Sequence, residues 1–106
     1  MAMDPGLTSR RKRIDEIDLG LVKLLNDRAK LAIEIAHCKK RGNMRILDKE
    51  REQIVLRRVS KKSKGPLTAD AVVRIFRAIL RESRHLQRQA IEPAKQSGTA
   101  SRGKKK

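Results

Sequence analysis

The chain has 106 residues, with 28 Lys and Arg against 12 Asp and Glu, a formal net charge of +16 and a single aromatic residue, Phe76. This length allows one domain, and the abundance of Ala, Leu, Ile, Arg, Lys and Glu favours helices. The charge favours an anionic partner such as nucleic acid, a membrane surface or a small acidic metabolite, whereas the near absence of aromatics argues against proteins that stack single-stranded bases.

The first predicted helix covers about residues 8–41. Apolar side chains recur there at three- and four-residue steps, as on one face of a helix: Ile14, Ile17, Leu21, Leu24, Leu25, Leu31, Ile35 and Cys38. Thr8 or Ser9 can cap its start, and Gly42-Asn43 ends it. Residues 1–7 are expected to form a disordered N-terminus.

Two shorter helices are predicted to follow. The second covers about residues 48–62 with Asp48 as its N-cap, and the third covers about residues 68–91 with Thr68 as its N-cap. Residues 92–106 are expected to be a disordered basic tail. The prediction is therefore one all-α domain, residues 8–91, with one long and two shorter helices.

The length of the first helix predicts a homodimer. About 34 residues at 1.5 Å each make a rod of roughly 50 Å, whereas a compact domain of this size has a radius of gyration of about 13 Å. Two shorter helices cannot cover an apolar stripe over that whole length. A second copy lying alongside would cover it, so we expect an intertwined helical homodimer.

Cations interrupt the apolar stripe of this helix. Arg28 is in phase with Leu24 and Leu31, and Lys39 follows on nearly the same face, roughly 16 Å further along the axis. Two such side chains could grip a small dianion between them. Arg11 lies roughly 25 Å before Arg28 along the rod, so it could reach such a ligand only across an antiparallel dimer.

The other helices carry polar residues that share faces. Asp48, Arg51 and Glu52 stand at i, i+3 and i+4, and Ser83 and Gln87 stand at i and i+4 beside apolar residues, where uncharged donors need a partner. Each has an ordinary alternative. Asp48 can be only a cap, Arg51 and Glu52 can form a surface pair worth under about 1 kcal/mol, and Ser83 can bond its own helix.

In this order and at these separations, the residues resemble the motifs of the all-helical, AroQ-class chorismate mutases. The family pattern places an arginine at the start of a long helix, an arginine in its middle and a lysine near its end. Asp-x-x-Arg-Glu (or Gln) then opens the second helix, and Ser-x-x-x-Gln (or Glu) lies on the third. The matching residues are Arg11, Arg28, Lys39, Asp48-Lys49-Glu50-Arg51-Glu52 and Ser83-Arg84-His85-Leu86-Gln87. The resemblance covers about residues 8–90. Arg84 departs from it, because family members often have an apolar residue after the serine.

The resemblance implies a rearrangement of chorismate to prephenate, in phenylalanine and tyrosine biosynthesis, with no cofactor and no metal. Lys39 and Gln87 are implied as the catalytic residues, which donate hydrogen bonds to the ether oxygen of the breaking bond. The implied substrate-binding positions are Arg28, Asp48, Arg51, Glu52, Ser83 and, from the other chain, Arg11. Within this set Arg28 and Arg11 of the other chain hold the two carboxylates, and Ser83 assists one of them. Glu52 with Asp48 receives the ring hydroxyl, and Arg51 orients these groups.

Two alternatives stay open at this point. An isochorismate pyruvate-lyase would share the fold, although such relatives tend to lack the Arg51-Glu52 pair. A basic nucleic-acid-binding protein would explain the net charge but not the placement of Arg28 in an apolar stripe, so nucleic acid is not the expected partner. One cysteine, Cys38, fits a reducing compartment, and no apolar run approaches the roughly 20 residues of a membrane span. We therefore expect a cytoplasmic protein.

Overall fold

The computed structural model describes residues 4–92, and every regular element in that range is a helix. In chain order these are α1 (Pro5–Arg41), α2 (Lys49–Lys62) and α3 (Ala69–Ile91). The prediction of three helices, one long and two shorter, is confirmed. The predicted basic tail lies outside the described residues, apart from Glu92.

The two shorter helices begin directly after the predicted N-cap residues. Asp48 Oδ1 accepts a hydrogen bond from the backbone N–H of Arg51 at 3.0 Å, and Thr68 Oγ1 accepts one from that of Ala71 at 3.1 Å. Each side chain thereby satisfies an N–H group that a helix start leaves without a partner. The caps therefore determine where both helices start.

The start of α1 was predicted wrongly. Asp4 caps this helix, since its carboxylate accepts the N–H of Gly6 at 2.8 Å, and Pro5 occupies the first turn, where its missing N–H does no harm. Residues 5–7 are therefore helical, and Thr8 and Ser9 lie inside the helix. The other end agrees with the prediction, because Gly42 is the C-cap and Asn43 adopts a positive φ of 58°.

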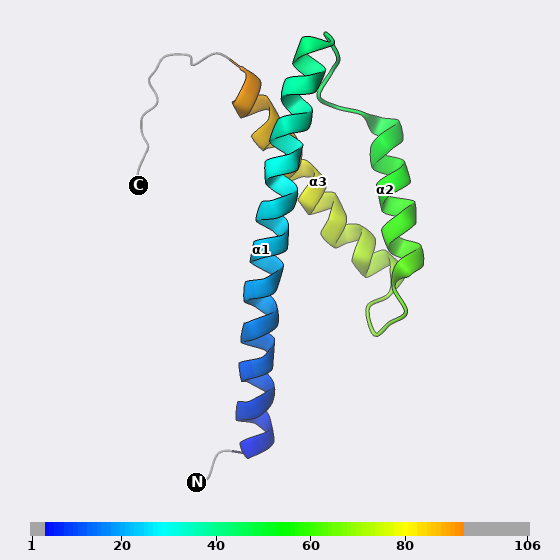
Figure 1. Cartoon of the computed structure of the whole chain (residues 1–106). Coiled ribbons are helices and arrows are strands. Elements are labelled where there is room, and N and C mark those ends of the chain that lie inside the picture. Colours follow the sequence, from blue (N-terminus) through cyan, green and yellow to red (C-terminus); the bar gives the residue numbers. More distant parts are fainter. Residues whose placement is uncertain (1–3, 93–106) are drawn as a thin grey trace.

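The helices are arranged around α3. Figure 1 shows α3 crossing the C-terminal half of α1 obliquely, with α2 to the side of both. Both α1 and α2 pack against α3, but they make no close backbone approach to each other. Ala32 and Ala36 are the buried residues of α1, and their small side chains let α3 come close.

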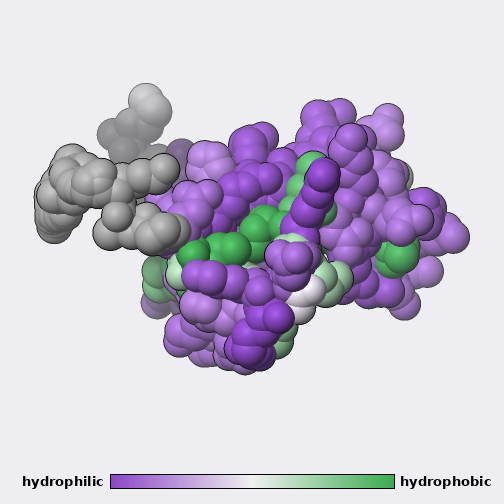
Figure 2. All heavy atoms as spheres, turned by 90° about the horizontal axis from the view of Figure 1, so that it is seen from above, coloured by the Kyte–Doolittle hydropathy of each residue, from purple (hydrophilic) through white to green (hydrophobic). Residues whose placement is uncertain are grey.

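A small core lies between α2 and α3. Its buried members are Val55, Leu56 and Leu80, and Val59, Val73 and Phe76 pack partly buried against them. The surface is largely hydrophilic, and in the view of Figure 2 hydrophobic residues gather in a narrow band across the middle. Among residues 4–92, no helix has an apolar stretch long enough to cross a membrane.

The N-terminal part of α1 has no packing partner within the described chain. Every residue from 7 to 27 is exposed, and the helix extends the molecule to 59 Å in its longest dimension. The apolar stripe predicted from the sequence is therefore uncovered: Ile17 is 59% exposed and Leu24 66%. Figure 1 shows this part of α1 projecting beyond α2 and α3.

Candidate active site

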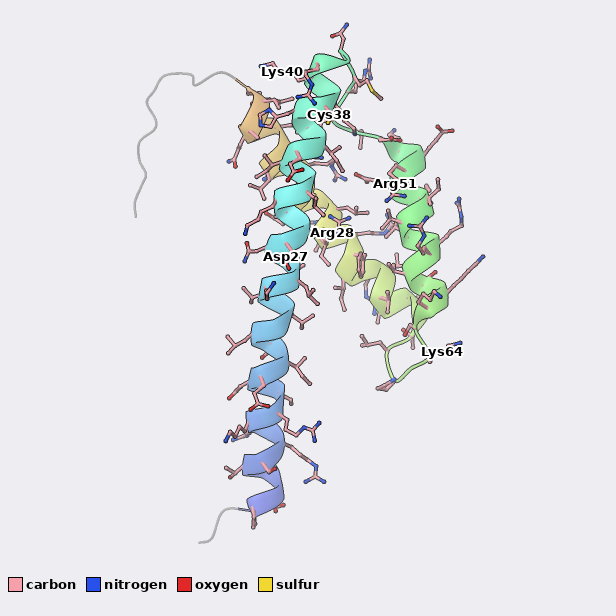
Figure 3. All side chains as sticks on the ribbon, in the orientation of Figure 1. Asp27, Arg28, Cys38, Lys40, Arg51 and Lys64 are labelled. Atoms are coloured by element: carbon pink, nitrogen blue, oxygen red, sulfur yellow. The ribbon has the colours of Figure 1, made fainter. Side chains whose placement is uncertain are left out.

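A pocket of about 400 Å³ lies where the three helices face one another, a size typical of small-ligand sites. Seven of the eight site residues predicted from the sequence line it: Arg28, Lys39, Asp48, Arg51, Glu52, Ser83 and Gln87. In Figure 3, Arg28 on α1 and Arg51 on α2 lie in the space between those helices. The eighth residue, Arg11, is exposed in the projecting part of α1 and does not line the pocket.

Arg28 is joined to α3 through Ser83. Its Nη1 donates a hydrogen bond to Ser83 Oγ at 2.8 Å, and both side chains are partly buried. The Ser83 hydroxyl oxygen accepts this bond, so its own O–H remains free to donate. The guanidinium keeps further N–H donors in a planar fork that suits a carboxylate.

Lys39 is anchored near the end of α1. Its Nζ donates to the carbonyl oxygen of Ile46 at 2.8 Å, in the loop that leads to α2. One of its three N–H groups is used in this way, and two remain for a ligand. The bond places a half-buried cation on the pocket wall in a defined position.

Gln87 is the buried polar residue of the described chain, 8% exposed. Its Nε2 donates to the backbone carbonyl of Ala32 at 2.9 Å, which gives this buried amide the partner it requires. The second N–H of the same amide is free to donate into the pocket. Ser83 and Gln87 therefore both have the partners that the sequence analysis required of them.

Glu52 pairs with an unexpected residue. Its Oε2 accepts a hydrogen bond from Arg84 Nη1 at 2.5 Å, and both side chains are largely shielded from solvent. The alternative of an ordinary surface pair between Arg51 and Glu52 is wrong, because no such ion pair occurs between residues 4 and 92. Arg84, noted in the sequence only as a departure from the family pattern, is thus part of the pocket wall.

The pocket has an excess of positive charge. Four cationic side chains and two carboxylates line it, which gives a formal charge of +2. One of the carboxylates, Asp48, also caps α2, and the other is paired with Arg84. The cations Arg28, Lys39 and Arg51 are consequently available to a ligand, and the balance suits a small dianion.

Sequence reasoning missed the apolar part of the pocket and one of its cations. The missed lining residues are Leu31, Ala32, Ile35, Ile46, Val55, Leu80 and Arg84. A signal was present for most of them. On α1 the missed residues lie within one turn of Arg28 or Lys39, and on α3 Leu80 and Arg84 stand at helical spacing from Ser83 and Gln87.

The fold and the pocket together define a class: small all-helical proteins in which three helices enclose a cationic pocket of metabolite size. The family model for chorismate mutase type II matches residues 10–88, so the chain belongs to the chorismate mutase type II family. The resemblance stated from the motifs is thereby confirmed.

Relatives and solved structures agree with this membership. The chain is 38% identical over 86 residues to a bifunctional chorismate mutase/prephenate dehydratase of Neisseria gonorrhoeae. The aligned residues make up 81% of this chain and 23% of that protein. It is 33% identical over 87 residues to a chorismate mutase of Methanocaldococcus jannaschii, and the aligned residues make up 81% of this chain and 88% of that one. A crystal structure of chorismate mutase from Helicobacter pylori in complex with prephenate superposes with a TM-score of 0.77 at 30% identity, covering 83% of this chain and 96% of that one. The chain thus spans about a quarter of the bifunctional relative's length.

Proposed function

We propose that the protein is a chorismate mutase, an isomerase that converts chorismate to prephenate on the route to phenylalanine and tyrosine. The observation that carries this proposal is the convergence of seven predicted side chains on one pocket. Family membership and the prephenate bound to the Helicobacter pylori relative support it. The roles that the family resemblance implies for those side chains are supported by their hydrogen bonds and by the chemistry of the reaction.

The first task is to hold a flexible dianion in a compact shape. Arg28 can grip one carboxylate with its remaining donors, and Ser83, which accepts from Arg28, can add its own O–H to the same group. Since the reaction joins the two ends of one molecule, such clamping brings the bond-forming carbons together. Among residues 4–92 no hydrogen bond reaches Glu52 Oε1, which can therefore accept the ring hydroxyl, with Arg51 and Asp48 beside it in the pocket.

The second task is to stabilise the negative charge that grows on the ether oxygen as the carbon–oxygen bond breaks. No proton moves in this rearrangement, so the protein needs donors rather than an acid and a base. Lys39 and Gln87 both have unused N–H groups and are already held by Ile46 and Ala32. Donors anchored before the reaction need no reorganisation during it, which is the condition for a large electrostatic effect.

We further propose a homodimer in which Arg11 of the partner subunit completes the pocket. The uncovered apolar side chains of α1 support a second copy, since burying them would remove a large hydrophobic area from water. An antiparallel pairing of two such helices brings the first turns of one against the pocket of the other. Arg11 would then give the second carboxylate its own cation.

The exposed thiol of Cys38, which is in no disulfide among the described residues, fits a reducing compartment. We therefore propose a cytoplasmic location.

The direct test is conversion of chorismate to prephenate by the purified protein, followed by chromatography, with isochorismate assayed in parallel. Prephenate formation with little pyruvate from isochorismate is the expected result. Pyruvate release alone would make the chain a lyase of the same fold. Turnover of neither substrate, together with salt-sensitive binding to duplex DNA, would favour the nucleic-acid alternative.

The shared site is tested by mixing two variants. Arg11→Ala and Arg28→Ala homodimers should each be inactive, because each lacks one clamp in both sites. A mixed dimer has one site that lacks both arginines and one that is intact. Unfolding and refolding the two variants together should therefore restore about a quarter of wild-type activity. No recovery in refolded, dimeric protein would refute the assignment of Arg11 to the partner's pocket.

A further inference from the structure

A second pocket shares one wall with the proposed active site. It has a volume of about 310 Å³ and is lined by residues of α2 and α3 alone, and we call it the outer pocket. Glu52, Leu80 and Arg84 line both pockets, while Lys49, Arg77 and Arg81 line only the outer one. The ion pair between Glu52 and Arg84 therefore stands in the partition between the two.

Electrostatics explain why Arg84 turns to Glu52. Glu52 is the one carboxylate among the residues that line the outer pocket, which otherwise contribute four cationic side chains. The side chains of Lys49, Arg77 and Arg81 make no hydrogen bond or ion pair with residues 4–92. Arg84 thus lies among like charges of both pockets, and Glu52, the carboxylate that both pockets share, is the opposite charge that attracts it.

The contact also orients the carboxylate. Arg84 binds Oε2, and within residues 4–92 Oε1 accepts no hydrogen bond. Both side chains keep only about a quarter of their surface exposed, 25% for Arg84 and 22% for Glu52, so the pair is partly shielded from water. A carboxylate held by one oxygen presents the other in a fixed direction.

We propose that Arg84 is a positioning residue, which holds Glu52 so that Oε1 faces the ring hydroxyl of the substrate and thereby selects hydroxyl-bearing rings. This inference rests on the proposed function. Arg84 bonds Glu52 rather than the reacting atoms, and the hydroxyl takes no part in bond making or breaking. Its contribution is therefore to binding in the ground state and the transition state alike, which changes KM more than kcat.

The experiment compares Arg84→Ala, Arg84→Lys and the matched control Arg81→Ala in steady-state assays. Arg81 is one turn away on α3, lines only the outer pocket and makes no ion pair among the described residues, so its loss removes the same charge without touching Glu52. For Arg84→Ala we expect KM to rise about tenfold, the value of one hydrogen bond to a charged group, with kcat within about threefold. Arg84→Lys should recover most of the KM, and Arg81→Ala should resemble wild type.

Two further measurements separate positioning from a merely structural role. An analogue of the substrate that lacks the ring hydroxyl should react equally well with wild type and Arg84→Ala. In a Glu52→Ala background, where Arg84 has no acceptor to hold, Arg84→Ala should cause no additional loss, because the residue acts through Glu52. An increase in KM that is equal for both substrates, or equal in Arg81→Ala, would overturn the inference. Absence of prephenate formation by the wild type would instead refute the proposed function.

Discussion

Replacing Lys39 with alanine gives the sharpest test of the proposed chemistry. Lys39 is half-buried on the pocket wall, with one N–H on Ile46 and two left for the ether oxygen. Removal of one donor to a developing oxyanion lowers kcat by about 10²- to 10³-fold, or about 2.7–4 kcal/mol. We therefore expect Lys39→Ala to lose at least about 10²-fold in kcat.

The same substitution also removes a structural hydrogen bond, and the next residue provides the control. Lys40 Nζ donates to the backbone carbonyl of Ile91 at 3.0 Å, a bond of the same kind, but Lys40 is exposed and does not line the pocket. Losing such a bond costs about 1 kcal/mol of stability. Lys39→Ala and Lys40→Ala should therefore lower the free energy of unfolding by similar amounts.

Single-turnover or steady-state rates of prephenate formation, measured with urea unfolding curves for both variants, separate the two effects. The catalytic assignment requires a large loss of kcat in Lys39→Ala alone. Near wild-type kcat in Lys39→Ala, or an equal loss in Lys40→Ala, would show that the cation does not act on the reacting oxygen.

Three other outcomes are expected. Wild-type activity should persist through neutral pH, whereas Gln87→Glu should lose activity as the pH rises above about 4–5, because a carboxyl donates only when protonated and its ordinary pKa is about 4.3; parallel pH–rate profiles for both proteins would contradict this. Ile17→Glu should prevent the proposed dimer from forming, as measured by light scattering, and abolish turnover, since Ile17 is 59% exposed on the uncovered face of α1; an active monomer would refute the proposed shared site. Thr68→Ala should reduce the free energy of unfolding by about 0.5–2 kcal/mol through loss of its cap, with kcat unchanged, as checked by denaturation and assay.

Local sequence signals predicted most of the fold. Asp48 and Thr68 marked the starts of two helices because a cap acts within three residues of itself, and Gly42-Asn43 marked an end for the same reason. The start of α1 was missed because Thr8 and Ser9 are also residue types that favour the N-cap position, as Asp4 is. The actual helix begins at the earlier signal, where the proline fits the first turn.

The site was predictable where its chemistry resembles a family pattern, and unpredictable where it depends on packing. Arg28 and Ser83 are 55 residues apart, and the resemblance to the family pattern placed them in one site. The pair between Glu52 and Arg84 was not predicted. The two residues are 32 positions apart, and their contact depends on how α2 and α3 cross, which the sequence does not give. The anchors of Lys39 and Gln87 were equally hidden, since both are backbone carbonyls, which every residue possesses.

Because α1 and α2 are held together by packing on α3, the shape of the pocket can change through substitutions on one helix. These two helices face each other across the cavity and are joined through α3, without packing on one another. Substitutions on α3 can therefore change the width of the cavity without disturbing any direct packing between α1 and α2. A bound dianion would act as the missing layer, linking Arg28 and Lys39 on one wall to Arg51 on the other. Occupancy should then slow hydrogen exchange in α2 more than in α3, whose backbone is already held on two sides.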